Sequence, residues 1–362
     1  MATNSEVKLM KGNEVVAHAA IHCGCDGYFG YPITPQTEII ETLTELKPWE
    51  TTGMVVLQAE SETSSINMLY GGAATGKKVM TSSSSPGISL MSEGLSYIAA
   101  TELPCLVVNV VRGGPGLGTI QPAQSDYFQN VKGGGHGDYH LIVLAPNSVQ
   151  EMYDFVFTGF DLAFKYRNPV MILSDGVIGQ MMEKVVLHGG QERFSDDFIK
   201  ENFDDWAITG KKGRTRNIAT SVELDPKVQE QFNFKLQAKY AEIEANEVKC
   251  EKTQCDDAEY LLVAYGSSSR ICAKAVQIAR AEGIKVGLFR PVTLYPFPKN
   301  EMLELSNQVK GILSVEMSAG QMIEDIKLAV ECKVPVAHYG RMGGMVYSPN
   351  EIVDELKKLM VK

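Results

Sequence analysis

Short apolar segments, many rich in β-branched residues, alternate with helix-length segments along most of this chain. The clearest is Cys105–Val111, which is apolar along nearly its whole length, as expected of a strand covered on both faces. The strands predicted in the first half are Gly27–Tyr31, Met54–Gln58, Lys78–Ser82, Cys105–Val111, Leu141–Ala145 and Pro169–Ser174. Because each is followed by a segment that suits a helix, the pattern predicts a parallel, doubly wound α/β sheet.

A second α/β unit is predicted near the end of the chain. Its expected strands are Tyr260–Tyr265, Lys285–Phe289, Gly311–Val315 and Val334–Tyr339. Residues 187–256 are charged and mixed, with a long helix expected over Asp225–Lys249, and we interpret them as a connector with an excursion. The prediction is therefore an α/β protein with two doubly wound domains, residues 1–186 and 257–362, joined by residues 187–256.

Charge and composition exclude several classes of function. The net charge of −10 argues against nucleic acid, because such binding depends on Lys and Arg neutralising phosphates. No apolar run is long enough to span a bilayer, and the N-terminus lacks a basic region followed by an apolar stretch, so we expect a cytoplasmic protein. The seven cysteines form no C-x-x-C pair and no cysteine–histidine cluster. We therefore expect no metal site and no iron–sulfur cluster on this chain.

Polar groups follow four of the predicted strands at their carboxyl ends, where open α/β sheets bind ligands. They are Tyr31-Pro32-Ile33-Thr34-Pro35, Gln58-Ala59-Glu60-Ser61-Glu62, Thr81–Gly87 and Arg112–Gly118. In the first, Pro32 and Pro35 stiffen the backbone around Thr34. Each group alone also has a structural explanation: acids suit a first helical turn, serines cap helices, and an arginine can be a surface charge. Four groups at successive strand ends favour a shared site.

Two other ligand motifs fail on inspection. The glycines after Arg112 do not have the spacing of a dinucleotide fingerprint, because Pro115 and Thr119 occupy positions that need glycine. This weighs against a nucleotide-dependent dehydrogenase, which remains an alternative. Ser174-Asp175-Gly176 lacks the first glycine of a Gly-Asp-Gly diphosphate-binding motif.

These motifs resemble the α subunit of 2-oxoacid:ferredoxin oxidoreductases. The resemblance rests on Tyr31–Pro35, Gln58–Glu60, Ser85–Met91 and Arg112–Pro115, and on Phe289–Pro298 and Gly340–Gly344 near the C-terminus. Within the family the chain resembles the corresponding chains of 3-methyl-2-oxobutanoate (2-oxoisovalerate):ferredoxin oxidoreductases, and 2-oxoglutarate oxidoreductase α subunits are similar too. The resemblance implies a thiamine diphosphate-binding domain of the pyrimidine type and a domain like the C-terminal one of transketolase.

The resemblance also implies roles for individual residues. Glu60 matches the catalytic glutamate that hydrogen-bonds the aminopyrimidine ring of thiamine diphosphate, and Glu62 is the second candidate. Thr34 and Arg112 match residues that bind the 2-oxoacid, since a guanidinium fork suits a carboxylate. Pro32, Ile33, Ser84 and Ser85 are implied to line the cofactor.

The implied reaction is oxidative decarboxylation of a 2-oxoacid with coenzyme A to an acyl-CoA, CO2 and reduced ferredoxin. Partner subunits are expected to complete the enzyme: a β subunit with the diphosphate and Mg2+ contacts, and γ and ferredoxin-like δ subunits, with iron–sulfur clusters on the partners. No basic residue lies between Arg112 and Lys132 to pair a second carboxylate, which favours a branched-chain acid such as 2-oxoisovalerate. The alternatives are 2-oxoglutarate, giving succinyl-CoA, and a non-catalytic assembly subunit.

Overall fold

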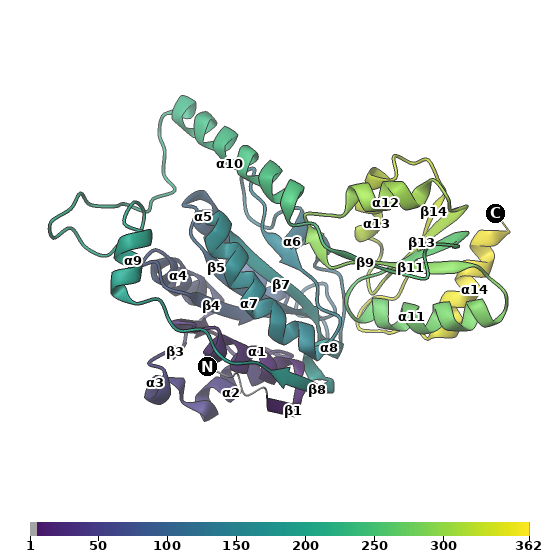
Figure 1. Ribbon diagram of the computed structural model, residues 1–362, viewed down its shortest axis with the longest axis horizontal. Coiled ribbons are helices and arrows are strands. Elements are labelled where there is room, and N and C mark those ends of the chain that lie inside the picture. Colours follow the sequence, from purple (N-terminus) through teal and green to yellow (C-terminus); the bar gives the residue numbers. More distant parts are fainter. Residues whose placement is uncertain (1–5, 362) are drawn as a thin grey trace.

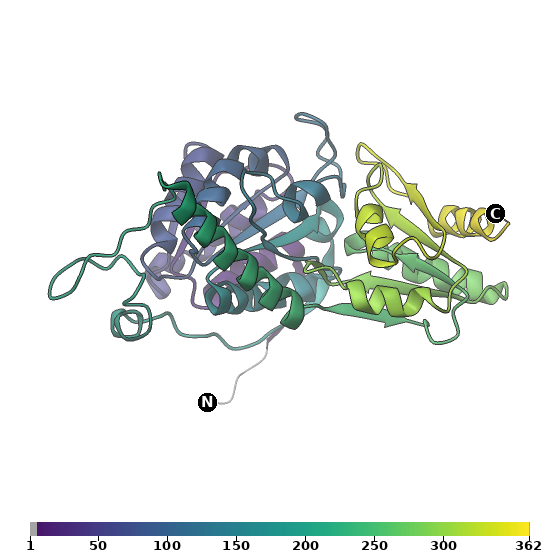
Figure 2. The same cartoon turned by 90° about the horizontal axis from the view of Figure 1, so that it is seen from above.

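A computed structural model of the chain describes residues 6–361. Residues 1–5, on which the expectation about an N-terminal leader rests, lie outside this range. Figures 1 and 2 show two α/β domains side by side, with the long helix α10 (Pro226–Asn246) running along the outside of the first. The predicted fold class of two doubly wound α/β domains is confirmed.

The first domain is built on a seven-stranded sheet in the order β12-β6-β7-β5-β4-β2-β3. All neighbours are parallel except β12, which pairs antiparallel with β6. The strands are β2 (Gly27–Gly30), β3 (Val55–Gln58), β4 (Val79–Ser83), β5 (Cys105–Val111), β6 (Ile142–Leu144), β7 (Pro169–Asp175) and β12 (Thr293–Tyr295). The six predicted strands are therefore present, and β5 has the predicted bounds.

Helices cover this sheet on both faces. On one side α1 (Gly12–His22) packs against α2 (Glu38–Leu46) and α7 (Val149–Tyr166), and on the other α4 (Glu62–Ala73) packs against α5 (Pro86–Ala100). Short helices complete the domain: α3 (Pro48–Thr51), α6 (Tyr127–Val131) and α8 (Gly176–Gln180). The buried strands β4, β5 and β7 form the centre of the core, because both their faces are covered.

The second domain has a five-stranded sheet in the order β14-β13-β10-β11-β9. Its strands are β9 (Cys250–Thr253), β10 (Tyr260–Val263), β11 (Val286–Pro291), β13 (Gly311–Glu316) and β14 (Val336–Gly340), and only β9 is antiparallel. Its helices are α11 (Gly266–Ala281), α12 (Lys299–Ser306), α13 (Met322–Ala329) and α14 (Pro349–Met360). The last begins with a capping box between Ser348 and Glu351.

The segment between the predicted domains has structure of its own. It contains α9 (Asp196–Asn202) and α10, and the α10 residues Leu236, Tyr240 and Ile243 are buried in the core of the first domain. Lys235 and Lys239 on the same helix form ion pairs with Glu102. Strand β9 lies inside this segment and joins the second sheet, while β12 returns from the second domain to the first. The division at residues 186 and 257 stays a prediction.

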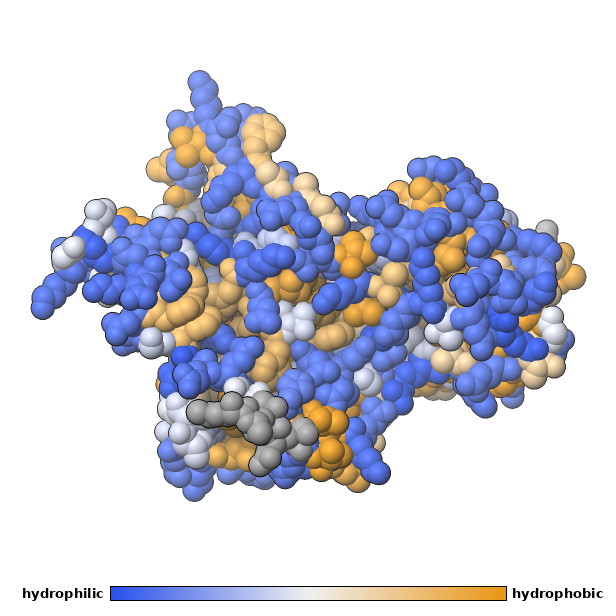
Figure 3. Space-filling model, in the orientation of Figure 1, coloured by the Kyte–Doolittle hydropathy of each residue, from blue (hydrophilic) through white to orange (hydrophobic). Residues whose placement is uncertain are grey.

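A two-stranded ribbon, β1 (Glu6–Lys11) with β8 (Met182–Leu187), lies beside the first sheet. Its outer face carries exposed Val7, Leu9, Met182 and Val186, and Figure 3 shows hydrophobic side chains at this position on an otherwise mainly hydrophilic face. Within residues 6–361 no helix combines the length and the apolar character needed to cross a membrane.

Candidate active site

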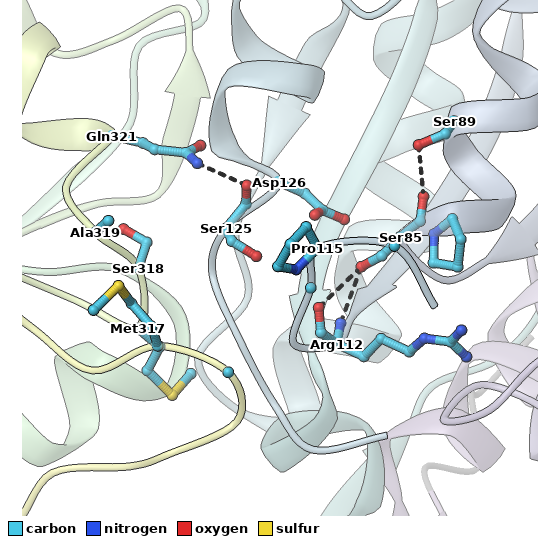
Figure 4. Close-up of a pocket in the computed structure, with 15 residues that line it drawn as sticks. Ser85, Ser89, Arg112, Pro115, Ser125, Asp126, Met317, Ser318, Ala319 and Gln321 are labelled. Atoms are coloured by element: carbon cyan, nitrogen blue, oxygen red, sulfur yellow. Dashed lines mark hydrogen bonds between the residues drawn. The ribbon is translucent and has the colours of Figure 1, made fainter. Parts of the chain in front are cut away.

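The four polar groups predicted at strand ends follow β2, β3, β4 and β5, which are neighbours in the sheet in the order β5-β4-β2-β3. Because these strands are parallel, their carboxyl ends meet at one edge, and the turns that follow them lie beside one another. The groups that follow β4 and β5 face the second domain at a cavity of about 640 Å³, lined by Ser85, Arg112 and Asp126 from the first domain and Met317 and Gln321 from the second. Thr34 and Glu60 do not line this cavity. Figure 4 shows these residues, with the Arg112 side chain pointing away from Met317.

The turn that carries Thr34 is fixed by hydrogen bonds with buried and half-buried side chains. Gln36 is fully buried, accepts a 2.6 Å hydrogen bond from Ser82 and donates to the Tyr31 carbonyl. The Pro35 carbonyl accepts hydrogen bonds from Asn13 and Gln180. Asn13, inside α1, therefore anchors this turn. Helix α2 begins at Glu38, so Pro35 lies before the helix, in the connection between β2 and α2.

Arg112 is buried behind this turn, with only 8% of its surface exposed. Its Nη1 donates a 2.8 Å hydrogen bond to the Thr34 carbonyl oxygen, so the two residues predicted to bind substrate are in contact. The Arg112 backbone is fixed by Ser85, whose Oγ lies 3.1 Å from the Arg112 nitrogen and 3.3 Å from its carbonyl oxygen. The Nε of Arg112 has no hydrogen-bond partner among the residues described.

Ser85 holds an uncommon backbone conformation, with φ of 23°. Its amide donates to Asn109 Oδ1 at 3.2 Å, and Asn109 Nδ2 donates to Asp126 at 3.0 Å. Burial raises the pKa of Asp126, although hydrogen bonds from Ser85 and Asn109 favour its charged form. Residues in such strained conformations cluster at functional sites, where surrounding contacts hold them.

Glu60 follows β3 at the same edge. Gly30 at the end of β2 pairs with Gln58 at the end of β3, and the Ala59 amide donates a 2.8 Å hydrogen bond to the Gly30 carbonyl. The two segments therefore run side by side toward Pro32 and Glu60. The Glu60 side chain is exposed, and its carboxylate has no hydrogen bond or ion pair within residues 6–361. Glu62 is instead buried at the start of α4. Of the two, Glu60 is free to bind a ligand from outside this chain.

The remaining predicted residues border the same edge. Pro32 and Ile33 are half-buried in the turn, and Ser84 is fully buried at the end of β4. The hydroxyls of Ser83 and Ser84 have no partner among the described residues, which is unusual for buried polar groups. The free Glu60 carboxylate fits a polar heteroaromatic ring such as the pyrimidine of thiamine diphosphate, because it can accept a hydrogen bond from the ring. The described residues contain no group of three or more His, Cys, Asp or Glu able to hold a metal ion.

Three residues at this site are absent from the sequence prediction: Asn109, Asp126 and Gln36. Asn109 leaves a signal, because it is the one polar residue inside the apolar strand β5. Gln36 and Asp126 leave none, since their importance comes from contacts with segments distant in the sequence.

The comparisons with known proteins agree with this geometry. The profile of the family described as "Pyruvate flavodoxin/ferredoxin oxidoreductase, thiamine diP-bdg" matches residues 18–251, and "Pyruvate:ferredoxin oxidoreductase core domain II" matches residues 258–352. The chain therefore belongs to the pyruvate:ferredoxin oxidoreductase family of 2-oxoacid oxidoreductases, and its first domain is of the thiamine diphosphate-binding type. The predicted family and its thiamine cofactor are confirmed.

Several relatives cover nearly the whole chain. The chain is 49% identical to "Ketoisovalerate oxidoreductase subunit VorB" of Methanothermobacter thermautotrophicus, over 97% of both chains. It is 34% identical to "2-oxoglutarate synthase subunit KorA" of Methanocaldococcus jannaschii, over 96% of this chain and 98% of that one.

Two solved structures share the fold. The 2-oxoglutarate:ferredoxin oxidoreductase from Magnetococcus marinus matches with a TM-score of 0.85 and 30% identity, over 98% of this chain and 65% of that one. A split-gene transketolase, 12% identical over 97% of this chain and 98% of that one, matches with a TM-score of 0.61 and shows the fold alone.

Proposed function

We propose that this chain is the α subunit of a 2-oxoacid:ferredoxin oxidoreductase and supplies the pyrimidine-binding half of its active site. The contact between Arg112 and Thr34 carries the proposal, because it places a buried guanidinium at the sheet edge that also holds the free Glu60 carboxylate. In the overall reaction the bond between the carboxylate and the oxo carbon breaks and CO2 leaves. The acyl group passes to the sulfur of coenzyme A, whose thiol proton is released, and two electrons pass to ferredoxin.

Each residue has a distinct task. Thiamine diphosphate, when bound, supplies the carbon that adds to the oxo group and stores the electrons released by decarboxylation. Glu60 holds a proton shared with the pyrimidine ring, and a carboxylate can do this because it accepts a short charge-assisted hydrogen bond. Arg112 binds the substrate carboxylate with its fork, and Thr34 orients the substrate beside it. Pro32, Ile33, Ser84 and Ser85 line the cofactor side.

We infer that the substrate is a branched-chain 2-oxoacid such as 2-oxoisovalerate. Two observations support this: the relatives near 50% identity are named ketoisovalerate oxidoreductase subunits, and no basic residue lies between Arg112 and Lys132. A dicarboxylic acid would leave its far carboxylate without a partner on this loop, which is costly in a buried site. The second candidate is 2-oxoglutarate, favoured by the KorA relatives.

The rest of the enzyme is assigned to partner chains. A β subunit would hold the diphosphate and Mg2+, and γ and ferredoxin-like δ subunits would carry the iron–sulfur clusters that pass electrons to ferredoxin. The seven cysteines of this chain are free thiols, and five of them are buried. We therefore expect the chain to be inactive alone, and turnover by the purified single chain would overturn this assignment.

A Glu60→Gln substitution in the reconstituted complex tests the proposal. We expect the complex to assemble normally while 2-oxoacid-dependent reduction of a viologen dye falls by about 10²–10⁴-fold. Glu50→Gln, another exposed acid in the same domain, is the control and should retain full activity. Full activity of Glu60→Gln would refute its role and favour an assembly function. A panel of 2-oxoacids with coenzyme A identifies the substrate.

A further inference from the structure

The loop that follows Arg112 is fastened to the second domain through Gln124. The Gln124 amide donates to Met317 O at 2.8 Å, and its carbonyl accepts from the Tyr265 hydroxyl at 3.2 Å. Its side-chain oxygen accepts from the Met317 amide and the Ser268 hydroxyl, and its side-chain nitrogen donates to Tyr265 O. All four polar atoms of this buried residue therefore bond to the second domain.

Gln321, just before α13, forms hydrogen bonds with the same loop on both sides of Asp126. Its Nε2 donates to the Ser125 carbonyl and its Oε1 accepts from the Phe128 amide, each at 2.8 Å. The Gln321 amide is itself fixed, because it donates at 2.9 Å to the fully buried carboxylate of Glu316. Figure 4 shows Gln321 reaching across the cavity to Ser125.

A continuous set of contacts then leads from Asp126 to the substrate residues. Asp126 accepts from Asn109, and Asn109 accepts from the amide of Ser85. Ser85 bonds the Arg112 backbone, and Arg112 bonds Thr34. The conformation of Ser85 and the place of Arg112 thus depend on where Asp126 is held.

We propose that Gln321 is a positioning residue, which acts with Gln124 to hold the loop around Asp126 and so places Arg112 for the substrate carboxylate. The second domain then contributes directly to substrate binding, beyond its part in assembly. This inference rests on the proposed role of Arg112. A misplacement of about 1 Å at a reacting centre can cost about 10²-fold in rate, so the two hydrogen bonds of Gln321 are sufficient for a measurable effect.

Arg270 offers a matched control. It also crosses between the domains, with a 2.7 Å ion pair to Glu183 and a 2.9 Å hydrogen bond to Asn147 O. Neither partner belongs to the loop of residues 113–132. Arg270→Ala therefore removes two interdomain contacts without touching this loop, whereas Gln321→Ala removes two contacts that hold it.

The test compares these variants in the assembled enzyme. For Gln321→Ala we expect a KM for the 2-oxoacid raised by about tenfold, with the KM for coenzyme A unchanged. We also expect faster hydrogen exchange of the amides of residues 124–128. Arg270→Ala should change neither KM nor this exchange. Equal effects of both variants, or loss of thermal stability in Gln321→Ala with unchanged KM and exchange, would overturn the proposal.

An Arg112→Lys variant measured in parallel separates the two proposals. If it leaves the KM for the 2-oxoacid unchanged, the role of Arg112 in substrate binding fails. The amide exchange of residues 124–128 in Gln321→Ala then still decides whether Gln321 holds the loop. If Arg112→Lys raises this KM and Gln321→Ala does not, only the positioning role of Gln321 is refuted.

Discussion

The Arg112 guanidinium lies 2.8 Å from the carbonyl oxygen of Thr34, although 77 residues separate the two in the sequence. One nitrogen of the fork is thus committed to the protein, while Nε has no partner among the described residues. The hydrogen bond fixes the plane of the guanidinium, so the remaining N–H groups have a set direction. A planar fork held in this way suits a carboxylate.

The first prediction follows from this geometry. Arg112→Lys keeps the positive charge but loses the planar fork, and a single ammonium cannot bond both Thr34 and a carboxylate with the same geometry. Because hydrogen bonds to charged groups contribute about 1.5–3 kcal/mol, we expect the KM for the 2-oxoacid to rise at least about tenfold. Steady-state dye reduction by the assembled enzyme measures this. An unchanged KM would show that the carboxylate binds elsewhere.

The sequence is sufficient to predict six of the seven strands of the first sheet, because buried parallel strands are short apolar runs that can be identified without knowledge of their neighbours. It is not sufficient for β12, whose residues Thr293–Tyr295 pair with a strand some 150 positions earlier in the chain. The ribbon of β1 and β8 is missed for the same reason: its strands are half-exposed, and their pairing is visible only in three dimensions.

The residues of the candidate site likewise fall into those that can be predicted from the sequence and those that cannot. The place of Thr34, Glu60 and Arg112 at one edge of the sheet can be predicted, because each lies in a motif directly after a strand and parallel strands bring such motifs together. Their roles in binding stay predictions. Asn13 shows what cannot be predicted from the sequence. It lies in α1, and its side-chain amide bonds the Pro35 carbonyl 22 residues away. The roles of Gln124 and Gln321 cannot be predicted from the sequence either, since a glutamine gives no indication of its hydrogen-bond partners until the fold is known.

A second prediction concerns the packing of α4, which begins directly after Glu60 and Ser61. A Cβ atom on Gly94 of α5 would lie 2.6 Å from two carbons of Ile66, a buried β-branched residue of α4. We expect Gly94→Ala to lower the free energy of unfolding by about 1–3 kcal/mol, because the two helices must separate. Gly71→Ala on α4 is the control: its Cβ would have no atom within 4 Å, and it should be neutral or stabilising by up to about 1 kcal/mol. Chemical denaturation that ranks the two variants in the opposite order would contradict this packing.

The third prediction is a pH dependence of stability. Burial, reinforced by the neighbouring His22 and Lys8, lowers the pKa of His18 from 6.5 to about 4. As the pH falls, the unfolded chain binds this proton first, so the unfolded state gains stability relative to the folded one. The contribution of His18 is therefore complete above about pH 6.5 and is lost as the pH falls toward 4.

His18→Gln should accordingly lose less stability than the natural chain between pH 7 and pH 5. Thermal unfolding at the two pH values measures the difference, with His136→Gln on an exposed loop as the control, which should follow the natural chain. An equal loss of stability in His18→Gln and the natural chain would exclude His18 as the cause.

The last prediction addresses the choice of substrate. Ile120 is 59% exposed on the loop after Arg112, and this loop folds back because Gly113 bonds both Thr119 and Gln121. A lysine at position 120 would bring an ammonium close to Arg112, where the far carboxylate of a dicarboxylic acid lacks a partner. We expect Ile120→Lys to raise the ratio of kcat/KM for 2-oxoglutarate over 2-oxoisovalerate by about tenfold, which corresponds to about 1.4 kcal/mol. Ile120→Gln removes the apolar side chain without adding charge and should leave the ratio within about twofold. If both variants change the ratio equally, the missing cation on this loop does not determine the preference for an apolar acid.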